Sequence, residues 1–222
     1  EEIKNSMLLY AVTDRAWLKE NEDLTFVCEA VLENGATFLQ IREKDLDEGT
    51  FEQEAEALKK LCAQYHIPFV VNDSVEIALD IDADGVHVGQ SDIKGRDIRS
   101  MIGNEKILGI SAGTVEEAIA AEKAGADYIG VGAVFGTSTK KNARNLTVEK
   151  LKEISESVSI PVVAIGGIGV SNIMELVESG VDGVAVVSAI FAAENPGEAT
   201  AKLLKLSKEM VLLRNIVSPK GG

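Results

Sequence analysis

The stretch FLQIREK, residues 38–44, combines the apolar pattern of a strand with two cations at its end. Side chains alternate along a strand, so Gln40, Arg42 and Lys44 share one face, while Ile41 faces the opposite way. An apolar face covered by helices is typical of a parallel sheet. Two cations cannot form ordinary core, because unpaired buried charge is very costly. We therefore expect a strand whose inward face becomes polar where the strand ends; an edge strand with a solvated face is the alternative.

Segments of this length recur along the chain and alternate with segments of helical periodicity. The predicted strands are residues 8–12, 38–44, 69–72, 85–88, 107–111, 128–131, 162–165 and 183–187. Three of them repeat one feature, an aspartate just before the apolar run, at Asp84, Asp127 and Asp182. Eight such units in 222 residues predict an α/β fold, a (β/α)8 barrel closed by a parallel sheet. An open doubly wound sheet is the alternative, but no G-x-G-x-x-G turn follows the first strand.

The helix signals lie between these strands. Thr50 and Gln53 have the spacing of a capping box, and a last helix is expected over residues 196–210. The tails, about 1–6 and 212–222, are polar and are expected to be loose. No Pro/Gly/Ser-rich linker divides the chain, so the whole of it is expected to form one domain.

Composition excludes several classes of partner. The net charge of −14 argues against nucleic-acid binding and against attraction to anionic membranes. No apolar run is long enough to span a bilayer, and no signal peptide opens the sequence, so a cytoplasmic location is expected. Cys28 and Cys62 fall at apolar helical positions, which indicates buried free thiols.

The active site of such a barrel lies at the carboxyl ends of its strands. Polar or glycine residues occupy nearly every one of these positions, which random surface polarity would not arrange so regularly. They are Gln40, Arg42, Lys44, Asn72, Asp73, Gln90, Asp92, Ser111, Gly136 to Lys141, Gly166 to Gly169, Val187 and Ser188. The sequence therefore predicts a site at this rim.

Asp73 and Asp92 follow neighbouring strands of the predicted barrel. Adjacent strands are about 4.8 Å apart, so the two carboxylates can share one cation. Two carboxylates without a nearby Cys or His favour a hard cation, Mg²⁺ rather than Zn²⁺. The alternative is that Asp73 caps the helix beginning near Val75.

Mg²⁺ beside Arg42 and Lys44 is a typical way to hold a diphosphate, and Lys140 is a candidate third cation. Gly166 and Gly167, with the start of the helix after the last strand, suit a second anion, because these loops often bind phosphate in barrels. His87 alternates with valines in its strand and is expected to pack inside the barrel below the site.

Several segments, in this order and spacing, carry a resemblance to one family. They are LYAVTDR (9–15), QIREK (40–44), VND (71–73), ADGVHVGQSD (83–92), LGISA (108–112), TSTKK (137–141), AIGGI (164–168) and VVSAI (186–190). The chain resembles the thiamine phosphate synthase family over nearly its whole length. That resemblance implies a transferase that couples a pyrimidinylmethyl diphosphate (HMP-PP) to a thiazole phosphate, giving thiamine phosphate and diphosphate.

The resemblance also implies roles for residues. Catalytic roles fall to Arg42, Lys44, Ser111 and Lys140. HMP-PP would contact Gln40, Ile41, Arg42, Glu43, Lys44, Asn72, Ser111 and Lys140. The thiazole phosphate would contact Thr137, Ser138, Thr139, Gly167, Val187 and Ser188. One Mg²⁺ would be held by Asp73 and Asp92.

Two features depart from the family pattern: Gly113 replaces a larger polar residue, and Gly136 replaces a proline. Two rival functions remain. One is a thiazole tautomerase on the same barrel, and the other is a sensor that binds thiamine phosphate without turnover. The intact cations and carboxylates favour the synthase. The sequence does not give the oligomeric state.

Overall fold

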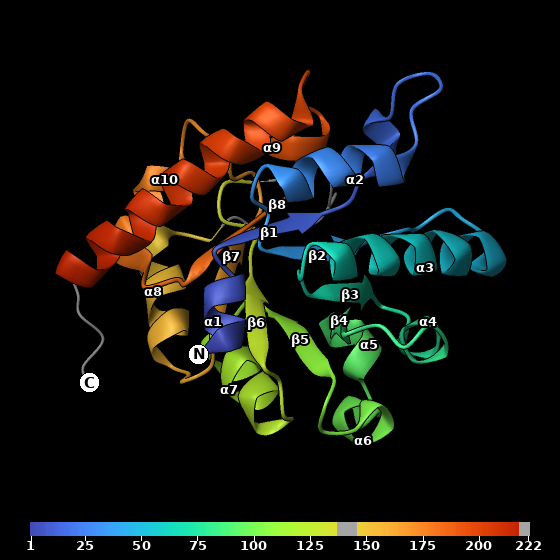
Figure 1. Ribbon diagram of the computed structural model, residues 1–222. Helices are drawn as coiled ribbons and strands as arrows, with labels where there is room; N and C mark the ends of the chain where they lie inside the picture. Colours follow the sequence, from blue (N-terminus) through green and yellow to red (C-terminus); the bar gives the residue numbers. More distant parts are fainter. Residues whose placement is uncertain (137–145, 218–222) are drawn as a thin grey trace.

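The computed structural model describes residues 1–136 and 146–217. Parallel strands form a closed barrel in chain order, and the helices lie outside the ring (Figure 1). The strands are β1 (Leu9–Val12), β2 (Phe38–Ile41), β3 (Phe69–Asn72), β4 (Gly85–Val88), β5 (Ile107–Ala112), β6 (Tyr128–Val131), β7 (Val162–Ile165) and β8 (Gly183–Val186). The predicted barrel is confirmed, and a closed ring leaves no place for an edge strand or an open sheet.

The helices connect and cover these strands. They are α1 (Glu2–Ser6), α2 (Leu24–Glu33), α3 (Glu48–Gln64), α4 (Val75–Asp80), α5 (Gln90–Ile93), α6 (Ile98–Ile102), α7 (Val115–Lys123), α8 (Val148–Glu156), α9 (Ser188–Phe191) and α10 (Pro196–Val217), with 3₁₀ segments η1 (Arg15–Trp17) and η2 (Ile173–Ser179). No helix among the described residues is long and apolar enough to cross a membrane.

Several helix boundaries differ from the prediction. Asp47, not Thr50, caps α3: its carboxylate accepts the Thr50 N–H, so the predicted capping box is wrong. The tail expected to be loose at residues 1–6 contains helix α1, and α10 continues past the predicted end to Val217. Residues 1–6 are mostly polar, which concealed the short helix α1. Residues 211–217 read VLLRNIV and are largely apolar, so the continuation of α10 was missed although the sequence is compatible with it.

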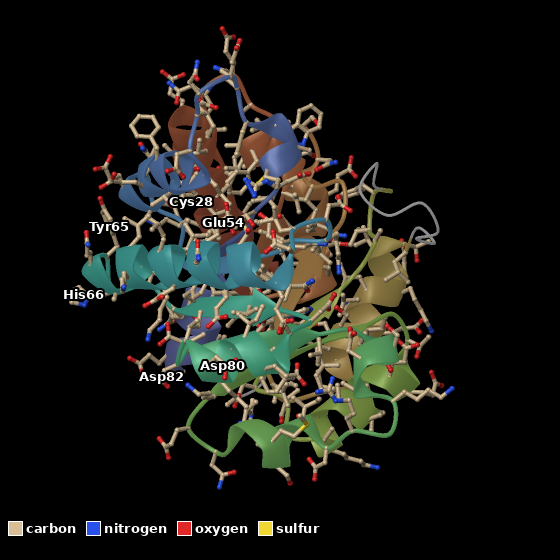
Figure 2. The ribbon with its side chains drawn as sticks, turned by 90° about the vertical axis from the view of Figure 1, so that its right-hand side faces the viewer. Cys28, Glu54, Tyr65, His66, Asp80 and Asp82 are labelled. Atoms are coloured by element: carbon tan, nitrogen blue, oxygen red, sulfur yellow. The ribbon has the colours of Figure 1, made fainter. Side chains whose placement is uncertain are left out.

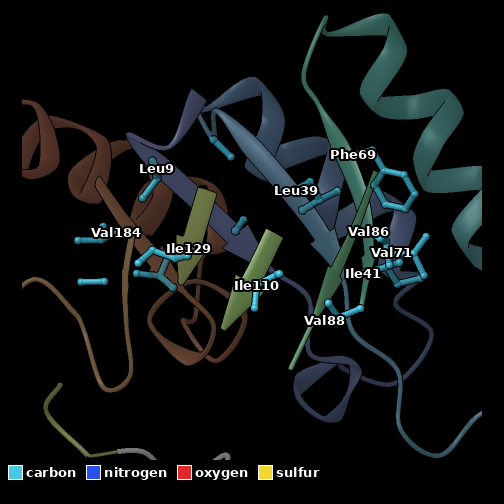
Figure 3. Packing of buried hydrophobic residues seen from close by; sticks show 14 of the residues in the cluster. Leu9, Leu39, Ile41, Phe69, Val71, Val86, Val88, Ile110, Ile129 and Val184 are labelled. Carbon is cyan, nitrogen blue, oxygen red and sulfur yellow. The ribbon is translucent and has the colours of Figure 1, made fainter. Parts of the chain in front are cut away.

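Apolar side chains form one layer outside the ring of strands and another inside it. The larger lies between the barrel and the helices and includes Leu39, Ile41, Val71 and Val86, which point away from the barrel axis (Figure 3). It also holds Cys28 and Cys62, which are buried free thiols as predicted. The smaller layer fills the barrel interior and consists of Met7, Tyr10, Val12, Phe38, Val70, Tyr128, Val163 and Ala185. The inward residues of β2 are thus Phe38 and Gln40, which confirms the predicted alternation.

The repeated aspartates link neighbouring strands at their amino ends through hydrogen bonds. Asp84 Oδ2 accepts the Phe69 N–H (2.8 Å), and Asp127 Oδ2 accepts the Leu108 N–H (2.8 Å). Asp182 does the same for β7, 2.9 Å from the amide nitrogen of Val162. Each carboxylate satisfies a donor at the start of the preceding strand, so the sequence repeat has a structural reason.

Candidate active site

A cavity of about 1040 Å³ opens at the carboxyl ends of the strands. Most of the described candidate residues line it: Gln40, Arg42, Lys44, Asn72, Asp73, Asp92, Ser111, Gly167, Val187 and Ser188. Ile41 and Glu43 do not. The candidates at 137–140, with Lys141, lie outside the described residues.

Arg42 and Lys44 face the cavity although they lie beyond the end of β2. The predicted strand ran to Lys44, but β2 ends at Ile41, and Arg42 and Lys44 lie in the loop that follows. Both still line the cavity, because Thr13 fixes the first residue of that loop: its hydroxyl accepts the Arg42 N–H (3.0 Å). Thr13 is itself fully buried. The strand boundary was therefore wrong, but the placement of the two cations was right.

Glu43 turns away from the cavity, towards α3. Its side chain is 3% exposed, and its Oε1 lies 3.7 Å from Arg15 Nη1, which also reaches both carboxylate oxygens of Glu54 at 3.4 Å. Glu54 lies on the side of α3 that faces α2 (Figure 2). Burial, followed by the hydrogen bond and charge of Glu54, raises the pKa of Glu43 to about 8. The residue between the two cavity cations thus anchors their loop to a helix.

The two predicted metal ligands lie beside each other. Asp73 adopts a left-handed backbone (φ +66°), which Asp tolerates better than most residues, and its carboxylate forms an ion pair with Lys44 Nζ. Ser74, not Asp73, caps α4 by accepting the Ile77 N–H, so the capping alternative for Asp73 is wrong. Burial raises the pKa of Asp92, with a further contribution from the neighbouring Asp73 carboxylate, although the Gly89 N–H opposes the shift.

This donor set fits Mg²⁺. The charge of the Asp73 carboxylate helps to raise the pKa of Asp92, and a cation shared by the two carboxylates would relieve that repulsion. Mg²⁺ is usually held by one or two carboxylates and completes its octahedron with water and phosphate oxygens. Among residues 1–136 and 146–217, no three or more Asp, Glu, His and Cys side chains gather as an all-protein metal cage. Asp73 and Asp92 are the residues that would hold the ion.

A hydrogen-bonded chain of side chains forms the cavity floor. Gln40 Nε2 donates to Tyr10 Oη (2.7 Å), which lies 2.6 Å from Tyr128 Oη. Tyr128 Oη lies 2.8 Å from His87 Nδ1, and His87 Nε2 lies 2.8 Å from Ser111 Oγ. His87 is buried inside the barrel, as predicted, and it also lines the cavity.

The loops after β7 and β8 form the opposite wall. Gly166 (φ +110°) and Gly167 (φ +62°) have a left-handed backbone, and a Cβ on Gly167 would lie 2.2 Å from the Gly136 carbonyl oxygen. No other residue fits this crossing of two loops. Asn172 closes the turn, donating to the Gly167 carbonyl (2.8 Å) and accepting the Gly169 N–H (2.9 Å).

Sequence reasoning missed several residues of the cavity. Tyr10, Glu117 and Phe135 line the cavity. Gln90, expected only to lie near the rim, donates a hydrogen bond from Nε2 to the Ser111 carbonyl (2.8 Å). Glu117 Oε2 accepts the N–H of Gly113 (2.8 Å), so a helix carboxylate reaches back to the loop where the sequence departs from the family pattern. Tyr10 could have been found from the inward period of β1. Glu117 carried only a helix-start signal.

Comparison with known proteins gives one consistent family. The family model described as thiamine monophosphate synthase matches residues 9–190. A thiamine-phosphate synthase of Alkaliphilus oremlandii is 50% identical over 195 residues, 88% of this chain and 93% of the relative. That of Clostridium tetani is 45% identical over the same shares.

Solved structures agree. A thiamine phosphate pyrophosphorylase from Pyrococcus furiosus superposes with a TM-score of 0.85 and 40% identity, covering 94% of this chain and 99% of the other. A geranylgeranylglyceryl phosphate synthase from Thermoplasma acidophilum superposes with a TM-score of 0.69 over 94% of this chain and 97% of the other. Its 15% identity supports only the shared barrel fold.

Proposed function

The chain belongs to the thiamine monophosphate synthase family, and from that premise we propose that it couples HMP-PP to a thiazole phosphate and releases diphosphate. The observation that carries the proposal is the convergence of Arg42, Lys44, Asp73 and Asp92 on one cavity that also has a glycine-lined wall. Two anionic groups need two such subsites, and one cavity of about 1040 Å³ has room for both substrates.

The diphosphate of HMP-PP binds at the wall formed by the loop after β2 and the carboxyl ends of β3 and β5. Arg42 offers a planar fork of donors for two phosphate oxygens, and Lys44 adds a point charge. Ser111 and Asn72 contribute neutral hydrogen bonds from the cavity surface. Four other residues were candidates for this substrate. Lys140 is proposed as a third cation, and Gln40 on the floor as a contact of the pyrimidine ring. Ile41 and Glu43 do not line the cavity and are proposed to support this wall from behind.

The reaction needs no protein nucleophile. The bond between the pyrimidinylmethyl carbon and the bridging oxygen breaks, its electron pair leaves with the diphosphate, and the thiazole nitrogen bonds to the carbon. Arg42 and Lys44 stabilise charge that grows on the diphosphate as it departs, which accelerates the step if the charge is larger in the transition state. When bound by Asp73 and Asp92, Mg²⁺ supplies further electrostatic stabilisation of that leaving group.

The thiazole phosphate binds at the opposite wall. Gly167, Val187 and Ser188 line the cavity there, and the loops after β7 and β8 are the usual phosphate site of such barrels. Thr137, Ser138 and Thr139 are proposed to complete this subsite. Two anions on separate walls leave the reacting carbon and nitrogen to meet over the floor.

The test is diphosphate release from HMP-PP with and without the thiazole phosphate, and with and without Mg²⁺. We expect release together with thiamine phosphate formation only when both substrates and Mg²⁺ are present. Isomerisation of the thiazole alone, without diphosphate release, would identify the tautomerase. Binding of thiamine phosphate without turnover would identify the sensor. A cytoplasmic location stays a prediction.

A further inference from the structure

The hydrogen bonds of the cavity floor run without a break from Gln40 on β2 to Ser111 on β5. The intermediate members are Tyr10, Tyr128 and His87, from three other strands, and every donor–acceptor distance lies between 2.6 and 2.8 Å. The two ends line the cavity, and the tyrosines between them are buried: Tyr10 is 1% exposed and Tyr128 is 0% exposed. A chain of this kind joins two candidate substrate contacts through the barrel interior.

The protons of this chain have one consistent direction. Gln40 Nε2 can only donate, so Tyr10 Oη accepts from it. Because Tyr10 is buried, its own proton goes to its neighbour, Tyr128 Oη, 2.6 Å away. Tyr128 must then donate to His87 Nδ1, which makes this nitrogen an acceptor. The proton of a neutral imidazole is left on Nε2, which faces Ser111 Oγ.

Packing holds the members in place. The ring of Tyr128 stacks on the His87 ring, with centroids 5.6 Å apart, and meets the Phe38 ring edge-on at 5.6 Å. Gly109 makes room for it, since a Cβ there would lie 2.2 Å from the Tyr128 ring. Burial raises the pKa of both tyrosines, so each keeps the proton that the chain requires.

We propose that His87 is a positioning residue: as the Nε2–H tautomer it donates to Ser111 and thereby commits the Ser111 hydroxyl to donate into the cavity. A hydroxyl that already accepts from His87 directs its own proton elsewhere, and Ser111 lines the cavity wall proposed for the diphosphate. The consequence for catalysis rests on the proposed function. A fixed donor aimed at an anion stabilises it more than a hydroxyl free to rotate, because no reorganisation is needed.

The tautomer can be observed directly. The chain has two histidines, and His66 is exposed at the end of α3 (Figure 2). His66→Asn suits its left-handed backbone (φ +55°) and leaves His87 as the single imidazole. Two-bond ¹H–¹⁵N correlation spectra of this labelled variant should show a protonated Nε2 and an unprotonated Nδ1. A protonated Nδ1, in a neutral or a charged ring, overturns the proposal.

Two substitutions of His87 separate its two contacts. His87→Gln keeps an amide N–H near the position of Nε2 and can still donate to Ser111. His87→Asn reaches only towards Tyr128. Binding of inorganic diphosphate with Mg²⁺, measured by calorimetry, should weaken by up to about tenfold in the Asn variant and much less in the Gln variant, because the Ser111 hydroxyl is then free to turn away and its hydrogen bond to a charged group is weakened.

The same pair in a Ser111→Ala background tests whether His87 acts through Ser111. We expect Ser111→Ala to weaken diphosphate binding about tenfold and His87→Asn to add nothing further to that loss. Equal losses in both backgrounds would contradict the proposal. Thermal unfolding midpoints identify variants that do not fold. In that event Tyr128→Phe replaces them, and loss of the Nε2–H preference in its NMR spectrum is expected, whereas an unchanged tautomer overturns the directional chain.

Neither readout requires turnover. A protein with the Nε2–H tautomer and Ser111-dependent diphosphate binding, but with no thiamine phosphate formed, would refute the proposed function and leave this inference standing. A working synthase with a protonated Nδ1 would do the reverse.

Discussion

Arg214 Nη1 lies 2.8 Å from Asp182 Oδ1, in an ion pair whose side chains are 5% and 2% exposed. The guanidinium also donates to the Val181 carbonyl (2.7 Å), while the second carboxylate oxygen of Asp182 accepts the Val162 N–H (2.9 Å). The last helix is thereby joined to the amino ends of β7 and β8, on the side of the barrel opposite the cavity. The stabilising ion pair and the cavity therefore lie at opposite ends of the barrel, as is usual in this fold.

Arg214→Met should lower the free energy of unfolding by about 3–5 kcal/mol, because the buried Asp182 carboxylate would lose the guanidinium that lies 2.8 Å from it. Urea unfolding measures the change. Lys202→Met removes an exposed cation of the same helix and should change the stability by less than about 0.5 kcal/mol. A loss for Arg214→Met no larger than for this control would mean that the pair contributes nothing measurable.

Glu43→Gln should make stability less dependent on pH. The folded-state pKa of Glu43, about 8, lies above its ordinary value of 4.5, so its contribution is full below about pH 4.5 and is lost as pH rises through 8. The neutral amide avoids that loss. We expect Glu43→Gln to raise stability at pH 8 by at least about 1 kcal/mol, since one pKa unit corresponds to about 1.4 kcal/mol.

Denaturation curves at pH 5 and pH 8.5 test this expectation, with Glu20→Gln as an exposed control of equal charge change. The control should shift both curves alike. An equal slope of stability against pH in the wild type and the Glu43 variant would show that Glu43 titrates normally.

The barrel was predictable because its signals are local and repeated. Strand periodicity recurs along the chain, and the aspartates before β4, β6 and β8 repeat one local arrangement at the amino ends of those strands. Helix ends were harder to predict. Asp47 and Thr50 are both good caps three residues apart, and only the backbone conformation decides between them.

Candidate residues at the rim were predictable for a different reason: the fold fixes which strand ends meet. Arg42, Lys44, Asp73 and Asp92 needed only the order of strands. The contact of Tyr10 with Tyr128 spans 118 positions of sequence and depends on the shear of the closed barrel, which the periodicity does not contain. The burial of Glu43 against Glu54 likewise depends on how α3 packs, so a residue inside a recognised motif was assigned to the substrate although it faces away from the cavity.

Asp92→Asn keeps the size of the side chain and removes one of the two adjacent carboxylates. Mg²⁺ affinity in the presence of inorganic diphosphate should fall about tenfold or more, because a neutral amide is a far weaker ligand for a hard cation. Calorimetric titration with Mg²⁺ measures it. Asp80→Asn, on the exposed end of α4 (Figure 2), removes the same charge far from the cavity and should leave the affinity unchanged. Equal affinities in both variants would disprove the shared-ion site.

Arg42→Met tests the leaving-group role. Methionine keeps much of the apolar bulk of arginine, and the backbone N–H that Thr13 accepts is unaffected, so the loop should keep its place. The guanidinium that would stabilise the departing diphosphate is lost. Removal of one preorganised donor to a developing anion lowers kcat by about 100-fold or more, with a smaller change in KM. Arg42→Lys should recover part of the rate, since it restores the charge but not the planar fork.

The matched control is Arg96→Met, which removes an arginine whose ion pair with Glu76 lies outside the cavity. Steady-state kinetics at saturating concentrations of both substrates separates the two parameters. An unchanged kcat in Arg42→Met would leave Arg42 as a residue of the cavity wall without a part in the chemistry, and the charge of the leaving diphosphate would then have to be met by Lys44 and the metal.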